Sequence, residues 1–147
     1  MPRLGVLLMM TLMASPGAAA EASGAFAVAL SALPAAPGGA AQHRLEKRYE
    51  GDLAGTGEGV MLSAGAPEKG VAGYVAMEMV TATLAGRSGR FALQHNGIMD
   101  GRGQTLTIVV VPGSGTGALA GISGRMTIRI EGRQHFYTLS YDLPTSP

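Results

Sequence analysis

Two charged side chains have the spacing of residues that face the interior of a β-sheet protein. Lys47 lies two residues before Tyr49 in one alternating run, and Glu78 lies two residues before Val80 in another. Because successive side chains of a strand point to opposite faces, each charge shares the face of its aromatic or aliphatic neighbour. A carboxylate and an ammonium that lose their hydration must pair or shift their pKa values, so the two form a candidate site. The alternatives are an ion pair that only fills the lumen, and a register that leaves one charge in water.

An imidazole accompanies these charges, because His95 has the same parity as Phe91. On that face it could make a structural hydrogen bond, bind a ligand or transfer a proton. His43 and His135 lie near strand ends, and we expect them at the rim or in solvent. The histidines lack metal-ligand spacing, so no metal and no cofactor is expected. No catalytic residue is assigned. The candidate ligand-binding residues of the lumen are Lys47, Tyr49, Glu78, Phe91 and His95.

Eight segments of alternating polarity must position these residues. Glycines, prolines and an Asp-Gly turn separate them, and their β-branched and aromatic content is typical of strands. Short strands with short connections indicate an antiparallel barrel or sandwich. We predict an all-β fold, a closed antiparallel eight-stranded barrel, because closure removes exposed edges and leaves room for side chains or one small ligand. The expected strands are residues 24–31, 42–53, 55–64, 71–84, 89–99, 105–111, 125–131 and 135–143.

The first residues have the pattern of a secretory signal peptide. Arg3 precedes an uncharged apolar run over residues 4–13, and small residues follow up to Ala20. That run is too short to span a bilayer. We therefore predict a signal peptide over residues 1–20, cleaved near Ala20, and a barrel domain over residues 21–147. The protein would then be periplasmic or secreted, with no membrane span once the leader is removed. A retained anchor is the alternative.

Composition excludes several classes of protein. The chain has no cysteine, which excludes disulfides, thiolate metal sites and a cysteine nucleophile. It has 11 basic and 10 acidic residues without a basic block, and only 5% aromatic residues. A protein that binds the phosphate backbone needs clustered basic residues, and one that stacks on bases needs aromatic side chains. Because both are scarce here, no nucleic-acid partner is expected.

Two further motifs favour structural interpretations. Residues 115–120 imitate a dinucleotide-binding loop, but Gly121 and Gly124 interrupt the helix that such a loop requires. We interpret the segment as a glycine-rich corner between strands. Ser114 and Ser123 lack the spacing of a hydrolase nucleophile and a helix behind them.

One expected strand, over residues 71–84, is apolar on both faces. Val75 and Met77 share one parity, whereas Tyr74 and Val80 share the other. One face would then pack against something outside the barrel. A second copy of the chain is the expected occupant, which would make the protein a homo-oligomer.

Several segments together resemble a known family. They are KRYEGDLAGT (47–56), MLSAG (61–65), GYVAME (73–78), GRSGRFALQHNG (86–97), VVPGSGTG (110–117), LAGISG (119–124) and HFYTLSYDL (135–143). In this order they resemble bacterial proteins grouped as domain of unknown function 3224, over roughly residues 24 to 143. The resemblance implies a small antiparallel barrel similar to that of plant allene oxide cyclases, commonly oligomeric and without an assigned activity.

The resemblance extends to individual positions. Lys47, Glu78, His95 and the corner at residues 114–117 fall where the family pattern is expected. Gly113 departs from it, since an acidic residue is expected there, and this weakens any role of the corner as a site. The leader is a second departure, because the family is largely cytosolic.

Three functions remain open at this point. The first is binding of a small, mostly apolar molecule in the lumen, oriented by a few polar groups. The second, by fold analogy, is an isomerase or cyclase that acts on an apolar substrate with Glu78 or His95 as the proton-transfer group. The third is a structural or self-assembling protein.

Overall fold

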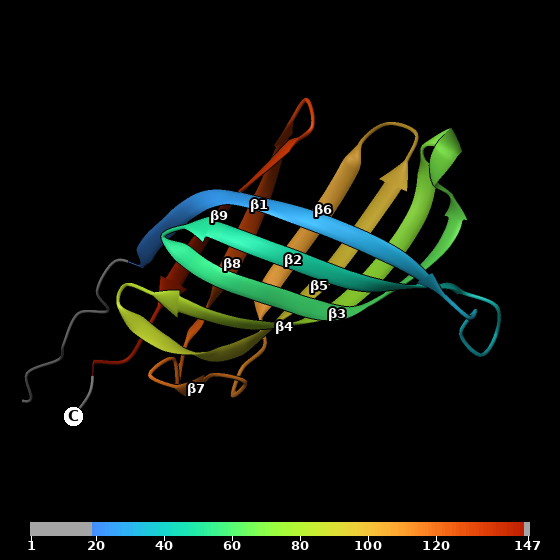
Figure 1. Cartoon of the computed structure of the whole chain (residues 1–147). Coiled ribbons are helices and arrows are strands. Elements are labelled where there is room, and N and C mark those ends of the chain that lie inside the picture. The colour runs from blue at the N-terminus through green and yellow to red at the C-terminus, as the bar shows by residue number, and fades with distance from the viewer. Residues whose placement is uncertain (1–18, 146–147) are drawn as a thin grey trace, which may run out of the picture.

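Residues 19–145 are described in a computed structural model, and they form a closed barrel of antiparallel strands (Figure 1). The strands are β1 (Ala20–Leu33), β2 (Ala41–Gly51), β3 (Leu53–Ala66), β4 (Val71–Leu84), β5 (Arg87–Asp100), β6 (Gln104–Val110), β7 (Thr116–Gly117), β8 (Ser123–Glu131) and β9 (Gln134–Asp142), with the 3₁₀ helix η1 (Pro67–Lys69) between β3 and β4. The ring runs β1-β2-β3-β4-β5-β6-β8-β9, and β9 pairs with β1 to close it. The predicted eight-stranded barrel is confirmed, and β7 adds a two-residue pairing against β5.

The first strand is longer than its sequence pattern indicated. It begins at Ala20 rather than at residue 24, and Ala22 pairs with Leu139 of β9 in the core. Residues 20–23 read Ala-Glu-Ala-Ser and do alternate, but they lie between the expected end of the leader at Ala20 and Gly24, so the predicted strand began at residue 24. Pairing with β9 in the closed ring extends the strand over these residues.

The expected leader falls largely outside the described residues. Residues 1–18 are not among them, so the signal peptide, its cleavage near Ala20 and export stay predictions. Within residues 19–145, no helix has the length and apolarity needed to cross a membrane.

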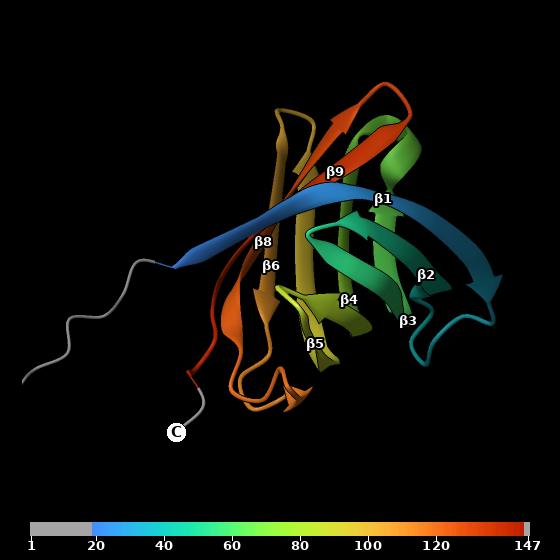
Figure 2. The same ribbon diagram turned by 60° about the vertical axis from the view of Figure 1, so that its left-hand side comes forward.

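One end of the barrel is filled with side chains. The connection from β6 to β8, which contains β7, lies at the end where β1 begins (Figures 1 and 2). It inserts Leu119 and Ile122, both almost completely buried, into the core beside Leu53 and Leu84. The segment that imitates a dinucleotide-binding loop is thus a corner that closes the barrel. Apolar burial of this kind stabilises the fold by about 25 cal/mol per Å² removed from water.

A tyrosine fastens the same end of the barrel. The Tyr137 hydroxyl of β9 accepts a hydrogen bond from the Leu53 backbone N–H at 2.9 Å and donates to the Glu50 carbonyl at 2.9 Å. These two backbone groups flank the turn from β2 to β3. The ring of Tyr137 also packs edge-on against Tyr49, with centroids 5.5 Å apart. Tyr137 therefore holds the β2–β3 hairpin to the last strand of the ring.

The outer face of β4 carries the apolar side chains that the sequence indicated, and the neighbouring strand β3 extends this apolar face. Val60 lies opposite Met77 in the register, and Leu62 lies opposite Val75. Val60, Val75 and Met77 are 42%, 50% and 47% exposed, which makes this face apolar over two strands. The expected homo-oligomer stays a prediction.

Candidate functional site

A buried carboxylate organises the polar interior of the barrel. Glu78 of β4 is fully buried, and Oε2 accepts hydrogen bonds from Lys47 Nζ of β2 and His95 Nε2 of β5, each at 2.9 Å. Oε1 accepts one from the Tyr49 hydroxyl of β2 at 2.7 Å. Lys47 Nζ also donates to the Tyr49 hydroxyl at 3.2 Å. The polar cluster, defined as Lys47, Tyr49, Glu78 and His95, thus joins three strands.

A glycine on the strand between them makes the polar cluster possible. The register places Gly57 of β3 beside Lys47 of β2. A Cβ at Gly57 would collide with Oε1 of Glu78, and the nearest atoms would all belong to that side chain. The carboxylate therefore occupies the space that a side chain at residue 57 would need. Alternation of Gly55, Gly57 and Gly59 on one parity is the sequence signal that could have revealed this space.

Burial and hydrogen bonding act in opposite directions on Glu78. Burial would raise its pKa, because it disfavours the charged form. The hydrogen bond from His95, the positive charge of Lys47 and the hydrogen bond from Tyr49 outweigh burial and lower the pKa below its usual range. Burial, followed by the charge of Glu78, raises the pKa of Tyr49 well above its usual range. Glu78 is therefore the anion of the cluster, and Tyr49 is a neutral donor to it.

The protonation of His95 follows from its partner. An ionised carboxylate only accepts hydrogen bonds, so Nε2 of His95 carries a proton. In a neutral imidazole Nδ1 is then a hydrogen-bond acceptor. With the imidazole neutral, the formal charges of the Lys47 ammonium and the Glu78 carboxylate cancel within the polar cluster.

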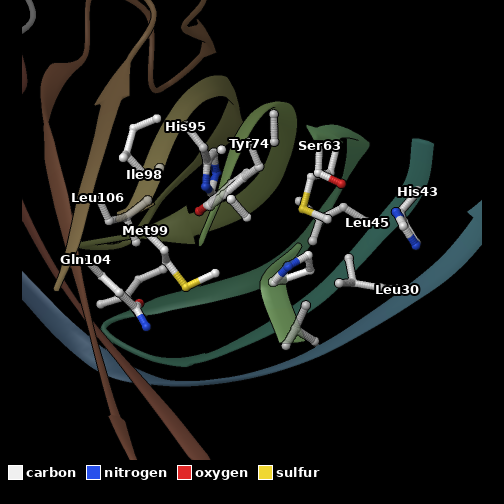
Figure 3. A pocket seen from close by; sticks show the side chains of 18 of the residues that line it. Leu30, His43, Leu45, Ser63, Tyr74, His95, Ile98, Met99, Gln104 and Leu106 are labelled. Carbon is white, nitrogen blue, oxygen red and sulfur yellow. The ribbon is translucent and has the colours of Figure 1, made fainter. Parts of the chain in front are cut away.

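A cavity of about 530 Å³ occupies the other end of the barrel, away from the corner that contains β7. Lys47 and His95 reach its floor, whereas Glu78 and Tyr49 are not among its lining residues. Figure 3 shows 18 of the lining side chains and labels ten of them. Among the described residues that line the cavity, Lys47 is the one Lys, Arg, Asp or Glu. The largest apolar lining residues are Phe26, Val28, Leu30, Leu45, Met61, Ile98, Met99, Leu106, Ile128 and Ile130.

The structure places the five candidate residues in three positions relative to the cavity. Lys47 and His95 line the cavity, and Tyr49 and Glu78 support them from behind. Phe91 is completely buried in the filled half and is not among the residues that line the cavity. A role for these residues in ligand binding stays a prediction. His43 and His135, expected at the rim, are partly buried and line the cavity.

Tyr74 is a lining residue that was not among the candidates. Its ring lies over Gly97 of β5, where a Cβ would collide with it. Burial, followed by the charge of Glu78, raises its pKa. Its parity with Glu78 was visible in the sequence, but the space at Gly97 depends on the register of β4 with β5. Tyr74 therefore adds a neutral hydroxyl to the cavity wall.

Metal binding has no geometric support in the described part of the chain. Among residues 19–145, no three His, Cys, Asp or Glu side chains gather into a possible metal site. Glu78 and His95 approach each other, but the Lys47 ammonium occupies the same carboxylate oxygen. A cation there would have to displace Lys47.

Comparisons with known proteins agree with this architecture. A family model described as "Protein of unknown function (DUF3224)" matches residues 18–141. A crystal structure of a protein with unknown function from the DUF3224 family of Shewanella oneidensis MR-1 is 41% identical, with a TM-score of 0.80. The alignment covers 87% of this chain and 99% of that chain. No functionally curated protein matches the chain. By its sequence and by its barrel, the chain belongs to the DUF3224 family.

Proposed function

We propose that this protein binds a small, mostly apolar molecule in the open half of its barrel. The observation that carries the proposal is the contrast between the two ends, one filled by Leu119 and Ile122 and the other hollow. The cavity volume of about 530 Å³ lies within the range of small-molecule sites, roughly 300–1,000 Å³. Such sites are mainly apolar, with a few polar groups that orient the ligand. Lys47, Tyr74 and His95 are suited to that orienting role.

The electrostatics favour binding over proton transfer. A general base works best with a pKa near the operating pH. The pKa of Glu78 is instead lowered, because hydrogen bonds and the charge of Lys47 outweigh the effect of burial. Glu78 also lies behind the residues that line the cavity. Of the two proton-transfer candidates, Glu78 and His95, it is His95 that lines the cavity, and its Nε2 is already engaged by the carboxylate.

The proposal is tested with a neutral apolar dye and a pair of matched variants. Nile red fluorescence is titrated against wild type, Ala76→Phe and Met77→Phe. Ala76 lines the cavity, whereas Met77, its neighbour on β4, is exposed on the outer face. We expect saturable binding to the wild type and to Met77→Phe, and a loss of about tenfold in affinity, or 1.4 kcal/mol, in Ala76→Phe.

Circular dichroism and urea unfolding establish that both variants are folded. Because a larger core residue can cost about 1–3 kcal/mol, Leu106→Trp serves as a second obstructing variant nearer the mouth, where Leu106 is 40% exposed. Thr107→Trp, on the opposite face of β6, is its control. Absence of saturable binding to the wild type, or equal affinity in all folded variants, would overturn the proposal.

A further inference from the structure

The proposed ligand must meet a floor whose charge is already balanced. Lys47 is the one Lys, Arg, Asp or Glu of residues 19–145 that lines the cavity, and its Nζ lies 2.9 Å from Oε2 of Glu78. The carboxylate lies behind it and does not line the cavity. A ligand thus encounters an ammonium whose positive charge is neutralised from the far side. This arrangement differs from a cationic site open to an anion.

The same ammonium still has hydrogen-bonding capacity. It carries three N–H groups, and in residues 19–145 two of them have acceptors, Glu78 Oε2 and the Tyr49 hydroxyl. The nitrogen also lies 4.8 Å from the centroid of the Phe26 ring, which lines the cavity. One N–H is therefore available to an acceptor atom of a ligand, and apolar surface surrounds it.

A carboxylate at this position would meet an unfavourable environment. It would share one ammonium with Glu78, and two anions that share one cation in a weakly hydrated site repel each other. An uncharged carbonyl or ether oxygen accepts the same N–H without adding a charge. It also loses less hydration on entry than an anion does.

We infer that the ligand is an uncharged molecule that carries a hydrogen-bond acceptor oxygen, such as an ester, ketone or aldehyde, on an apolar chain. This inference rests on the proposed function. The oxygen accepts a hydrogen bond from Lys47, and the chain lies against the apolar wall. Glu78 selects against carboxylate heads, because it cancels the charge that would bind them.

Three probes of equal chain length test this inference: methyl octanoate, octanoate and octane. Their dissociation constants are measured at pH 8 by displacement of Nile red. Any apolar cavity prefers an ester to a carboxylate, so the deciding quantity is how the octanoate-to-ester ratio changes on substitution. In Glu78→Gln the charge of Lys47 is no longer cancelled, and we expect octanoate to gain about tenfold or more relative to the ester.

One control variant separates the local charge from the net charge, and a second variant tests the hydrogen-bond donor. Glu58→Gln removes a carboxylate from an exposed position of β3, and the ratio should stay within about twofold of wild type. Lys47→Met removes the donor, and the advantage of the ester over octane should fall by several-fold, as expected for a lost hydrogen bond of about 1 kcal/mol. An unchanged octanoate-to-ester ratio in folded Glu78→Gln would overturn the inference.

A measurement on the wild type keeps the inference testable if Glu78→Gln does not fold. The infrared stretch of carbonyl-labelled methyl octanoate should lie at lower frequency in the complex than in a hydrocarbon solvent, as a hydrogen-bonded carbonyl does. A hydrocarbon-like frequency, or tighter binding of octanoate than of the ester to the wild type, would contradict it. If Nile red and all three probes fail to bind, the proposed function itself is wrong, and the inference falls with it.

Discussion

Lys47 and Glu78 form their ion pair across an intervening strand. They belong to β2 and β4, which both pair with β3, yet Nζ and Oε2 are only 2.9 Å apart. Gly57 of β3 contributes no side chain between them. The pair therefore depends on the register of three strands, and a change on the middle strand should break it.

Gly57→Ala should disrupt the polar cluster without touching a charged residue. The added methyl group would collide with Glu78, and we expect a loss of about 1–3 kcal/mol in the free energy of unfolding. Urea denaturation measures it. Gly103→Ala is the control, because a Cβ there meets no atom within 4 Å. In the Glu78→Ala background the collision partner is gone, so the cost of Gly57→Ala should shrink. Equal costs in both backgrounds would contradict this account.

Variants that remove the ion pair one residue at a time should rank in a fixed order of stability. Glu78→Leu leaves the Lys47 ammonium buried and unpaired, at a cost of about 3–5 kcal/mol. Adding Lys47→Met should restore part of the stability. The Tyr49 hydroxyl still lacks its carboxylate acceptor, at about 1–3 kcal/mol, so Tyr49→Phe should restore more. Chemical denaturation of the three variants checks the order. A double variant no more stable than Glu78→Leu alone would show that the ammonium is not the source of the cost.

Glu78 should make the protein less stable in acid. Its pKa in the folded protein is lowered from an ordinary value of 4.5, because the bonds from His95, Lys47 and Tyr49 outweigh burial. Between the folded and ordinary values the unfolded chain binds more protons, so stability rises with pH across this window. The contribution is complete above about pH 5 and is lost as the pH falls through the folded pKa.

Urea midpoints of wild type and Glu78→Gln, measured from about pH 7 to pH 3, check this dependence. The stability difference between them should shrink in acid. Glu58→Gln, on the outer face, should follow the wild-type curve. A difference between wild type and Glu78→Gln that stays constant with pH would show that Glu78 does not carry the effect.

Tyr137→Phe should weaken the filled end of the barrel. The hydroxyl satisfies the buried Leu53 N–H and the partly buried Glu50 carbonyl, and loss of the partner of the Leu53 N–H costs about 1–3 kcal/mol. Amide hydrogen exchange at Leu53 should become faster in the variant. Exchange at His95 in the other half should change little beyond the global loss of stability. Unchanged protection at Leu53 would mean that the hydroxyl is dispensable.

Strand parity was sufficient to predict which side chains face inward. Lys47, Glu78 and His95 are all buried, as their spacing with Tyr49 and Phe91 indicated. The period of two is a property of the backbone, so it survives any error in the bounds of a strand. The closed ring followed from the same pattern, because eight such strands without helices leave few architectures.

Position along the barrel axis could not be predicted in this way. Phe91 and His95 share a face of β5, yet Phe91 lies in the filled half and His95 lines the cavity. Which half a residue occupies depends on the tilt of the strands and on the loop that covers one end. Leu119 and Ile122 belong to that loop, and their sequence surroundings indicated only a glycine-rich corner.

The ring of strands is unevenly joined. The ladder between β6 and β8 has two residue pairs, Ile108 with Met126 and Val109 with Arg125, whereas that between β4 and β5 has fourteen. Leu106 and Ile128 line the cavity on these two strands beyond the last shared pair. The β5–β6 and β8–β9 hairpins end as separate tips in both views (Figures 1 and 2). The seam between β6 and β8, beside the cavity, is therefore the part of the ring held by the fewest ladder pairs, and we expect its backbone amides to exchange faster than those of the other seams.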